Sequence, residues 1–248
     1  PGRAPSVLAG ADGHFARLSR NGERIAYTKM RTDESGRESA NAIAVRTIGG
    51  REHLITPWIP GACCRAACDW SPDDQFVLAC GPTEEMATWP VDEATNARPS
   101  RVIFRLAQHN VWQGQYSPNG RWLVFETLRT RAQGASLGVI AVEGPPDRPW
   151  TRVPLRQRWA DKPRWSADGK ALYFLAADSS FIHLWAARFD PVRGVVVGEP
   201  VQLTHFDSPS FKISPAMSST ELDVGGGKVF LTMESTSGSI WMLDNVDR

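Results

Sequence analysis

The sequence lacks the features that would mark a membrane or nucleic-acid-binding protein. It contains no apolar run approaching the roughly 18 residues that a membrane-spanning helix needs. Neither sign of charge dominates, since 28 Lys and Arg face 27 Asp and Glu for a net charge of +1. With this balance the chain has no excess of positive charge that would attract nucleic acid or an anionic membrane surface. We therefore predict neither nucleic-acid binding nor membrane insertion.

A signal segment is also missing at the front of the chain, which begins with Pro1. We therefore expect a processed product or an excised piece of a longer protein.

Cysteine is scarce, and its spacing leaves several interpretations open. The four cysteines are Cys63, Cys64, Cys68 and Cys80. In an oxidising compartment they allow three disulfide pairings, and otherwise they would be free buried thiols. A zinc site fits worst, because the spacing matches no pair of metal-binding knuckles. We predict no metal and no other cofactor.

Helical periodicity is absent over any useful length, whereas turn-forming residues are abundant. The chain has 21 Gly, 18 Pro and 10 Trp, with 42% hydrophobic residues. This composition is typical of many short strands joined by turns around a packed core. It predicts an all-β protein.

A repeated sequence pattern explains why turn-forming residues are so frequent. A large apolar residue is followed by Ser, a turn rich in Pro, Asp, Asn and Gly, and an apolar run, which together predict a β-hairpin. The repeated serines stand at positions 19, 71, 117 and 166, at intervals of 52, 46 and 49 residues. A degenerate fifth copy has Phe211, Lys212, Ile213, Ser214 and Pro215, then an insertion, then an apolar run over 227–231.

Each hairpin is followed by two more strand-like segments. A third strand is expected at 42–45, 88–91, 139–142, 183–186 and 239–243, and a more exposed fourth at 52–55, 101–104, 151–155 and 200–204. Four strands per unit, at a period near 50 residues, predict the blades of a β-propeller.

The fifth unit lacks a fourth strand, while residues 4–8 resemble one. We expect this N-terminal strand to complete the blade that holds Trp241 and to close a ring of five blades. The alternative is a fragment of a six- to eight-bladed ring. The predicted single domain covers residues 1–248, with blades over 11–56, 62–106, 111–155, 160–204 and 209–248.

These hairpins resemble the repeat of the TolB-like, or PD40 (WD40-like), propeller family, in which a large residue precedes Ser-Pro-Asp-Gly. The resemblance covers the chain from Leu18 to Leu243. Asp74 departs from it in place of the turn glycine, and Arg20 and Ala167 stand in place of the proline. The resemblance implies a bacterial protein-interaction or signalling module, commonly outside the cytoplasmic membrane, and hence a periplasmic or other extracytoplasmic location.

One set of polar residues is a candidate binding site. Two positions before each repeated Ser stand Arg17, Asp69, Gln115, Arg164 and Lys212. Strand alternation turns them away from the large neighbouring residues and toward the central channel. There they would either bind an anionic ligand or peptide carboxylate, or hydrogen-bond neighbouring blades.

Three tryptophans are candidate interface anchors. Trp58, Trp150 and Trp159 lie in connections between strands, where an exposed indole would bind a protein partner. Our leading hypothesis is therefore a non-enzymatic module that binds a protein or peptide, with no catalytic residue.

An enzyme is the alternative, as a propeller glycosidase using paired carboxylates or as the accessory propeller of a hydrolase. The sequence G-A-S-L-G at 134–138 matches the G-x-S-x-G motif of α/β-hydrolases, with Asp161 and His183 following. The motif needs a strand, a strained turn and a helix, and no helix is expected there, so we interpret it as a loop.

Overall fold

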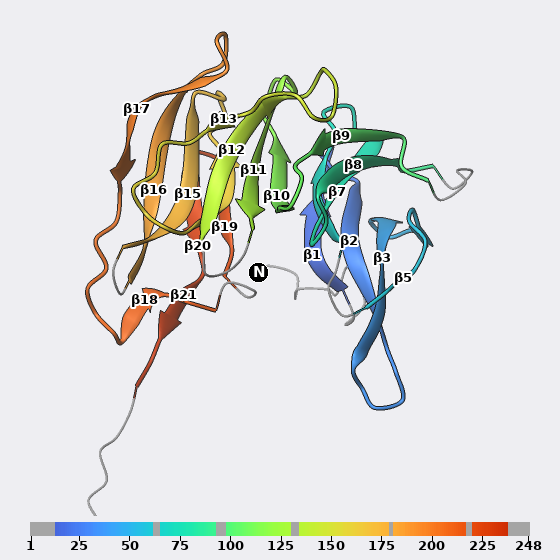
Figure 1. Cartoon of the computed structure of the whole chain (residues 1–248). Helices are drawn as coiled ribbons and strands as arrows, with labels where there is room; N and C mark the ends of the chain where they lie inside the picture. The colour runs from blue at the N-terminus through green and yellow to red at the C-terminus, as the bar shows by residue number, and fades with distance from the viewer. Residues whose placement is uncertain are drawn as a thin grey trace, which may run out of the picture.

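The computed structural model describes residues 13–61, 65–92, 98–129, 134–178, 181–216 and 220–237. All regular structure in these residues is β-strand (Figure 1). No helix among them is long and apolar enough to cross a membrane.

Four sheets of consecutive strands succeed one another along the chain, and each is one blade. Blade 1 contains β1 (Gly13–Leu18), β2 (Arg24–Thr32), β3 (Glu38–Thr47) and β4 (Glu52–Leu54), with β5 (Ile59–Pro60) also paired to β3. Blade 2 contains β6 (Ala66–Trp70), β7 (Phe76–Cys80), β8 (Glu85–Pro90) and β9 (Arg101–Arg105). Blade 3 contains β10 (Asn110–Tyr116), β11 (Trp122–Leu128), β12 (Ala135–Ala141) and β13 (Thr151–Arg152). Blade 4 contains β14 (Ala160–Trp165), β15 (Ala171–Asp178), β16 (Phe181–Asp190) and β17 (Val195–Gln202).

The repeated serine shapes the turn of every one of these hairpins. The hydroxyl of Ser117 accepts a hydrogen bond from the Trp122 amide at 3.0 Å and donates one to Asn119 at 2.8 Å. Ser19, Ser71 and Ser166 make the same pair of bonds. Because the four turns share these hydrogen bonds, each needs a Ser and an Asp or Asn two residues later.

The last blade differs from the sequence-based expectation. β18 (Phe211–Ile213) pairs with β21 (Met233–Ser235), and β19 (Leu222–Gly225) pairs with β20 (Lys228–Leu231). The hairpin therefore turns at Gly226 and Gly227, and not at the expected Ser214 and Pro215. The extra residues that begin at Ser214 interrupt the first strand of the hairpin, which resumes as β19.

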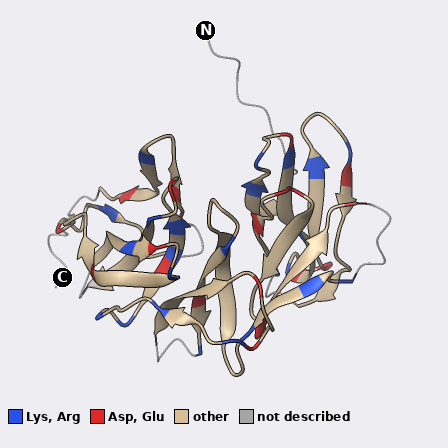
Figure 2. Ribbon diagram, turned by 90° about the horizontal axis from the view of Figure 1, so that it is seen from above, with Lys and Arg blue, Asp and Glu red and all other residues tan. Residues whose placement is uncertain are grey.

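The hydrophobic core lies between blades and not within one of them. One cluster joins Ile43 and Val45 of blade 1 to Trp70 and Val77 of blade 2, and three further clusters join blades 2 and 3, 3 and 4, and 4 and 5. Since neighbouring sheets bury each other's faces, the blades follow a curve when seen from above (Figure 2).

Ring closure stays a prediction. Residues 4–8, the expected third strand at 239–243 and Trp241 lie outside the described residues. Within the described part of the chain, no strand of blade 1 pairs with a strand of the last blade. Leu18, on the outer face of blade 1, is 57% exposed.

Candidate functional site

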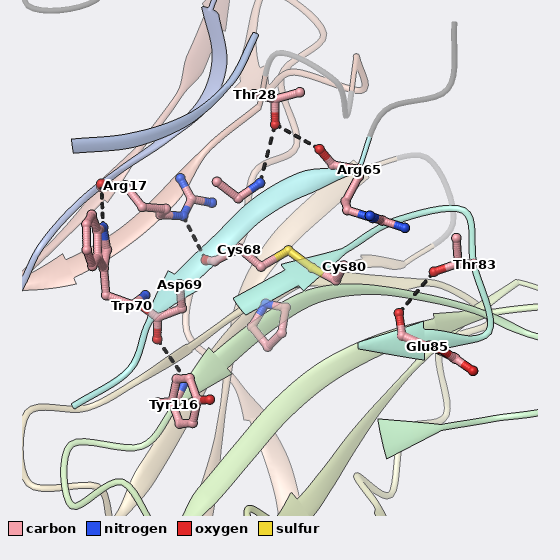
Figure 3. The surroundings of a disulfide bond; sticks show 12 residues. Arg17, Thr28, Arg65, Cys68, Asp69, Trp70, Cys80, Thr83, Glu85 and Tyr116 are labelled. Atoms are coloured by element: carbon pink, nitrogen blue, oxygen red, sulfur yellow. Dashed lines mark hydrogen bonds between the residues drawn. A yellow bond between two sulfur atoms is a disulfide. The ribbon is translucent and has the colours of Figure 1, made fainter. Parts of the chain in front are cut away.

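The polar residues at the predicted ring positions reach from one blade to the next. The Arg17 Nε donates to the carbonyl oxygen of Cys68 at 3.1 Å, and the Arg17 carbonyl accepts from the Trp70 indole at 2.9 Å (Figure 3). The Asp69 carboxylate accepts from the Tyr116 amide at 2.8 Å. Blades 1, 2 and 3 are thereby joined in series.

Blades 3 and 4 are joined in the same way. The Gln115 side chain accepts from the Trp165 amide, and the Gln115 carbonyl accepts from the Trp165 indole, both at 3.1 Å. Arg164 then reaches the last blade, with its Nη2 3.5 Å from a carboxylate oxygen of Glu221. A hydrogen-bonding role between blades was one of the two expected for these residues.

The residues Arg17, Asp69, Gln115 and Arg164, called the polar axis below, join one blade to the next. Burial and neighbouring charges shift the pKa values of two of them. Burial raises the pKa of Asp69, against the opposing effects of Arg20 and two backbone amides. Burial and the nearby Arg17 lower the pKa of Arg164 to about 10, so Arg164 stays protonated at neutral pH. Arg17, Asp69 and Arg164 are therefore close enough to affect one another.

The fifth position of the ring is not held by Lys212. Lys212 lies on β18, which pairs with β21, whereas β19 adjoins the innermost strand β14 of blade 4. The charges of the last blade that act on Arg164 are Glu221 and Asp223. The last blade therefore contributes acidic groups, in place of the lysine expected from the sequence. Ligand binding by these five residues stays a prediction.

The three predicted interface tryptophans are all half-buried. The Arg31 guanidinium stacks 3.8 Å from the ring centre of Trp58. Trp150 packs edge-on against Phe125, with ring centres 5.5 Å apart. The carbonyl of Trp159 accepts from the Ala177 amide. Their role as partner anchors stays a prediction.

Exposed apolar residues gather instead on the outer strand of blade 4, where the sequence analysis proposed no site. Val197, Val201 and Leu203, called the β17 patch below, are 42%, 61% and 45% exposed. All three side chains lie on the same face of the sheet as Leu184 and Ala186, whereas a depression of about 290 Å³ on the other face, toward blade 3, is lined by Pro154, Arg156, Gln157, Trp185, Glu199 and Pro200. The alternation of Val201, Gln202, Leu203 and Thr204 was the available signal, because on an outer strand it leaves apolar side chains facing solvent.

Two of the four cysteines form a disulfide. Cys68 on β6 is bonded to Cys80 on β7, so the bond ties the first two strands of blade 2 together (Figure 3). This selects the disulfide among the interpretations left open for these two residues. Cys63 and Cys64 lie outside the described residues.

The G-x-S-x-G match has no catalytic geometry. Ser136 lies within β12, one residue after this strand begins, and another strand segment follows in place of a helix. The segment is therefore not an α/β-hydrolase elbow, and it is not the loop that we expected either, because β12 begins earlier than 139.

Solved structures with a related fold include two TolB proteins. TolB from Acinetobacter baumannii is 18% identical with a TM-score of 0.56, over 89% of this chain and 51% of that chain. TolB from Agrobacterium tumefaciens is 20% identical with a TM-score of 0.52, over 75% and 63%. The chain has a TolB-like β-propeller fold. It spans roughly half to two thirds of the length of these two propeller proteins.

The TolB-like fold is shared by enzymes. A puromycin-hydrolyzing peptidase from Mycobacterium tuberculosis aligns with 16% identity and a TM-score of 0.58, over 90% of this chain and 43% of that chain. At such identities the likeness shows the fold alone. No protein-family model and no curated protein matches the sequence.

Proposed function

We propose that this TolB-like propeller is a non-enzymatic module that binds a protein partner through the β17 patch. The patch is the observation on which the proposal rests. Three apolar side chains within seven residues lie on one face of the outer edge of blade 4 and are 42–61% exposed. Exposed apolar residues gathered on one surface are typical of protein interfaces.

The position of β17 supports this proposal. It is the longest of the fourth strands of the blades, and within the described residues it pairs only with β16. Proteins usually protect such an edge with short strands, charges or proline. Gly198, Glu199 and Pro200 interrupt the edge, so side-chain contacts on either side of them would provide the binding surface.

A periplasmic or other extracytoplasmic location belongs to the same proposal. It is supported by the Cys68–Cys80 disulfide, because such bonds persist in oxidising compartments.

The enzyme alternative would rest on one carboxylate pair. Glu126 on β11 and Asp161 on β14 share a hydrogen bond and are 7% and 5% exposed. Neither side chain lines the depression on blade 4, nor those on blades 2 and 3. Because a glycosidase needs its carboxyl groups to face a sugar, the binding module is the better supported function.

A photo-crosslinking residue at Val201, in cells that make the protein, tests the proposal. We expect a covalent adduct with one defined protein, and none from the same residue at Ile48, a 43% exposed apolar side chain on blade 1. Titration of the purified partner should then show that Val201→Asp weakens binding at least about tenfold, while Ile48→Asp does not. No adduct at Val201, or equal effects of the two substitutions, would contradict the proposal.

A further inference from the structure

A second depression lies on blade 3, beside the ends of β11 and β12. It has a volume of about 260 Å³ and is lined by His109, Thr127, Arg129, Gly134, Ser136, Trp150 and Arg152. Thr127 and Ser136 are direct neighbours across the sheet, and Arg152 stands opposite Gly138, two residues further along β12. The side chains therefore converge from three adjacent strands.

The charge of this arginine pocket is unbalanced. Two arginines and a histidine line it, and none of its described lining residues is Asp or Glu. By contrast, Glu84 and Glu85 accompany Arg65 in a depression on blade 2, and Glu199 lies 3.5 Å from Arg156 in the depression on blade 4. Among the described residues, Arg129 donates to the Gln108 side chain at 2.9 Å and Arg152 donates to the Ser136 hydroxyl. Both acceptors are neutral, so neither cation is compensated there.

One buried polar group in the lining has no partner. Thr127 is 5% exposed, and its hydroxyl makes no hydrogen bond with any described residue. A buried hydroxyl is normally satisfied, so an unpartnered one beside two uncompensated arginines points to an absent acceptor.

The aromatic side of the arginine pocket, formed by Phe125 and Trp150 over Gly138, is tightly packed. A Cβ on Gly138 would lie 2.5 Å from the Phe125 ring and 2.6 Å from the Trp150 ring, so only glycine lets both rings occupy this face of the sheet. Trp150 is thereby fixed beside Arg152.

We propose that the arginine pocket binds an oxyanion, the phosphate or carboxylate group of a small molecule. Arg129 and Arg152 supply charge-assisted donors. The Thr127 hydroxyl gains the acceptor that it lacks, and Ser136 supplies a further hydroxyl. This site is separate from the β17 patch and does not depend on the function proposed above.

Calorimetric titration with inorganic phosphate and with succinate, at constant ionic strength set by sodium chloride, tests the proposal. We expect saturable one-to-one binding, with the tighter anion identifying the group preferred. Arg152→Gln should weaken binding about tenfold. Arg193→Gln, which removes the same charge from an exposed arginine in the loop before β17, should leave binding unchanged.

Thr127→Val separates binding from folding. It is nearly isosteric and removes only the unpartnered hydroxyl, so we expect about fivefold weaker binding with no loss of thermal stability. The proposal would be overturned by the absence of saturable heat from both anions, or by equal effects of Arg152→Gln and Arg193→Gln. Unchanged affinity in Thr127→Val would remove that hydroxyl from the site.

Discussion

At the scale of the residue, Glu126, Asp161 and Lys162 form a buried cluster between blades 3 and 4 whose charges balance. Lys162 is 3% exposed, and its ammonium nitrogen lies 3.8 Å from a carboxylate oxygen of Asp161. Burial and the Asp161 charge raise the pKa of Glu126 well above its ordinary 4.5. A protonated Glu126 that donates to Asp161, which in turn pairs with Lys162, satisfies all three groups with no net charge.

This arrangement makes stability depend on pH. In the unfolded chain Glu126 ionises above its ordinary pKa, whereas in the folded protein it keeps its proton to a higher pH. Between the two pKa values the folded state binds more protons, so its contribution to the free energy of unfolding falls as pH rises.

Glu126→Gln should therefore weaken the pH dependence. We expect the variant to be more stable than the wild type by about 1 kcal/mol or more at pH 8, with the difference vanishing or reversing near pH 4. Urea unfolding at several pH values measures it. Parallel pH profiles for the two proteins would contradict a raised pKa at Glu126.

Asp74 shows how a departure from the repeat is compensated. The corresponding turn residues Gly22, Gly120 and Gly169 have φ near +70°, and Asp74 adopts the same left-handed conformation with φ +57°. Its carboxylate accepts from the backbone amides of Arg20 at 2.8 Å and Asn21 at 3.0 Å. The side chain therefore joins the turns of blades 1 and 2, which a glycine could not do.

We expect Asp74→Gly to destabilise the protein by about 1–2 kcal/mol, although glycine is the residue of the other copies. The gain from relieving the left-handed conformation is smaller than the loss of two bonds to a buried carboxylate. Chemical denaturation of Asp74→Gly and of Asp74→Asn, which keeps one acceptor oxygen, would show the larger loss for glycine. A glycine variant at least as stable as the wild type would disprove this account.

At the scale of the element, local chemistry determines how much the sequence can predict. The turns of blades 1 to 4 could be predicted because Ser, Asp, Asn and Gly act within six residues of one another. The last blade could be predicted only in part, because its sequence offers two candidate turns, at Ser214 and Pro215 and at the glycines 225–227, and the repeat pattern favours the first. The arginine pocket also escaped prediction, since it combines side chains from several strands. The β17 patch lies along one strand, and its exposure depends on which elements pack against that strand and not on its own sequence.

The disulfide gives a prediction at this scale. Cys68 and Cys80 are separated by 12 residues and hold the two inner strands of blade 2 together. Removing the bond frees the unfolded chain, so Cys68→Ala/Cys80→Ala should lower the free energy of unfolding by about 2–3 kcal/mol. Guanidinium unfolding with and without a reductant measures it. The reductant should shift the wild type toward the variant and leave the variant unchanged; an equal shift in both would assign the effect to another pair of cysteines.

At the scale of the whole molecule, the propeller is a chain of interfaces, since every core cluster and every polar contact of the axis joins one blade to the next. Stability is then a property of neighbouring pairs, as in other repeat proteins. A blade with no neighbour on one side leaves a core position exposed. Leu18 is 57% exposed, whereas Ile213, which precedes the repeated serine of the last blade and packs against blade 4, is 1% exposed.

This contrast distinguishes an open series of blades from a closed ring. Ile213→Ala should cost about 2–4 kcal/mol, because it leaves a cavity between blades 4 and 5. Leu18→Ala should cost less than about 0.5 kcal/mol, because the side chain already faces water. Equilibrium unfolding of the two variants side by side measures both losses. If Leu18→Ala were as costly as Ile213→Ala, another part of the chain would have to cover blade 1 in solution, as closure by the N-terminal strand requires.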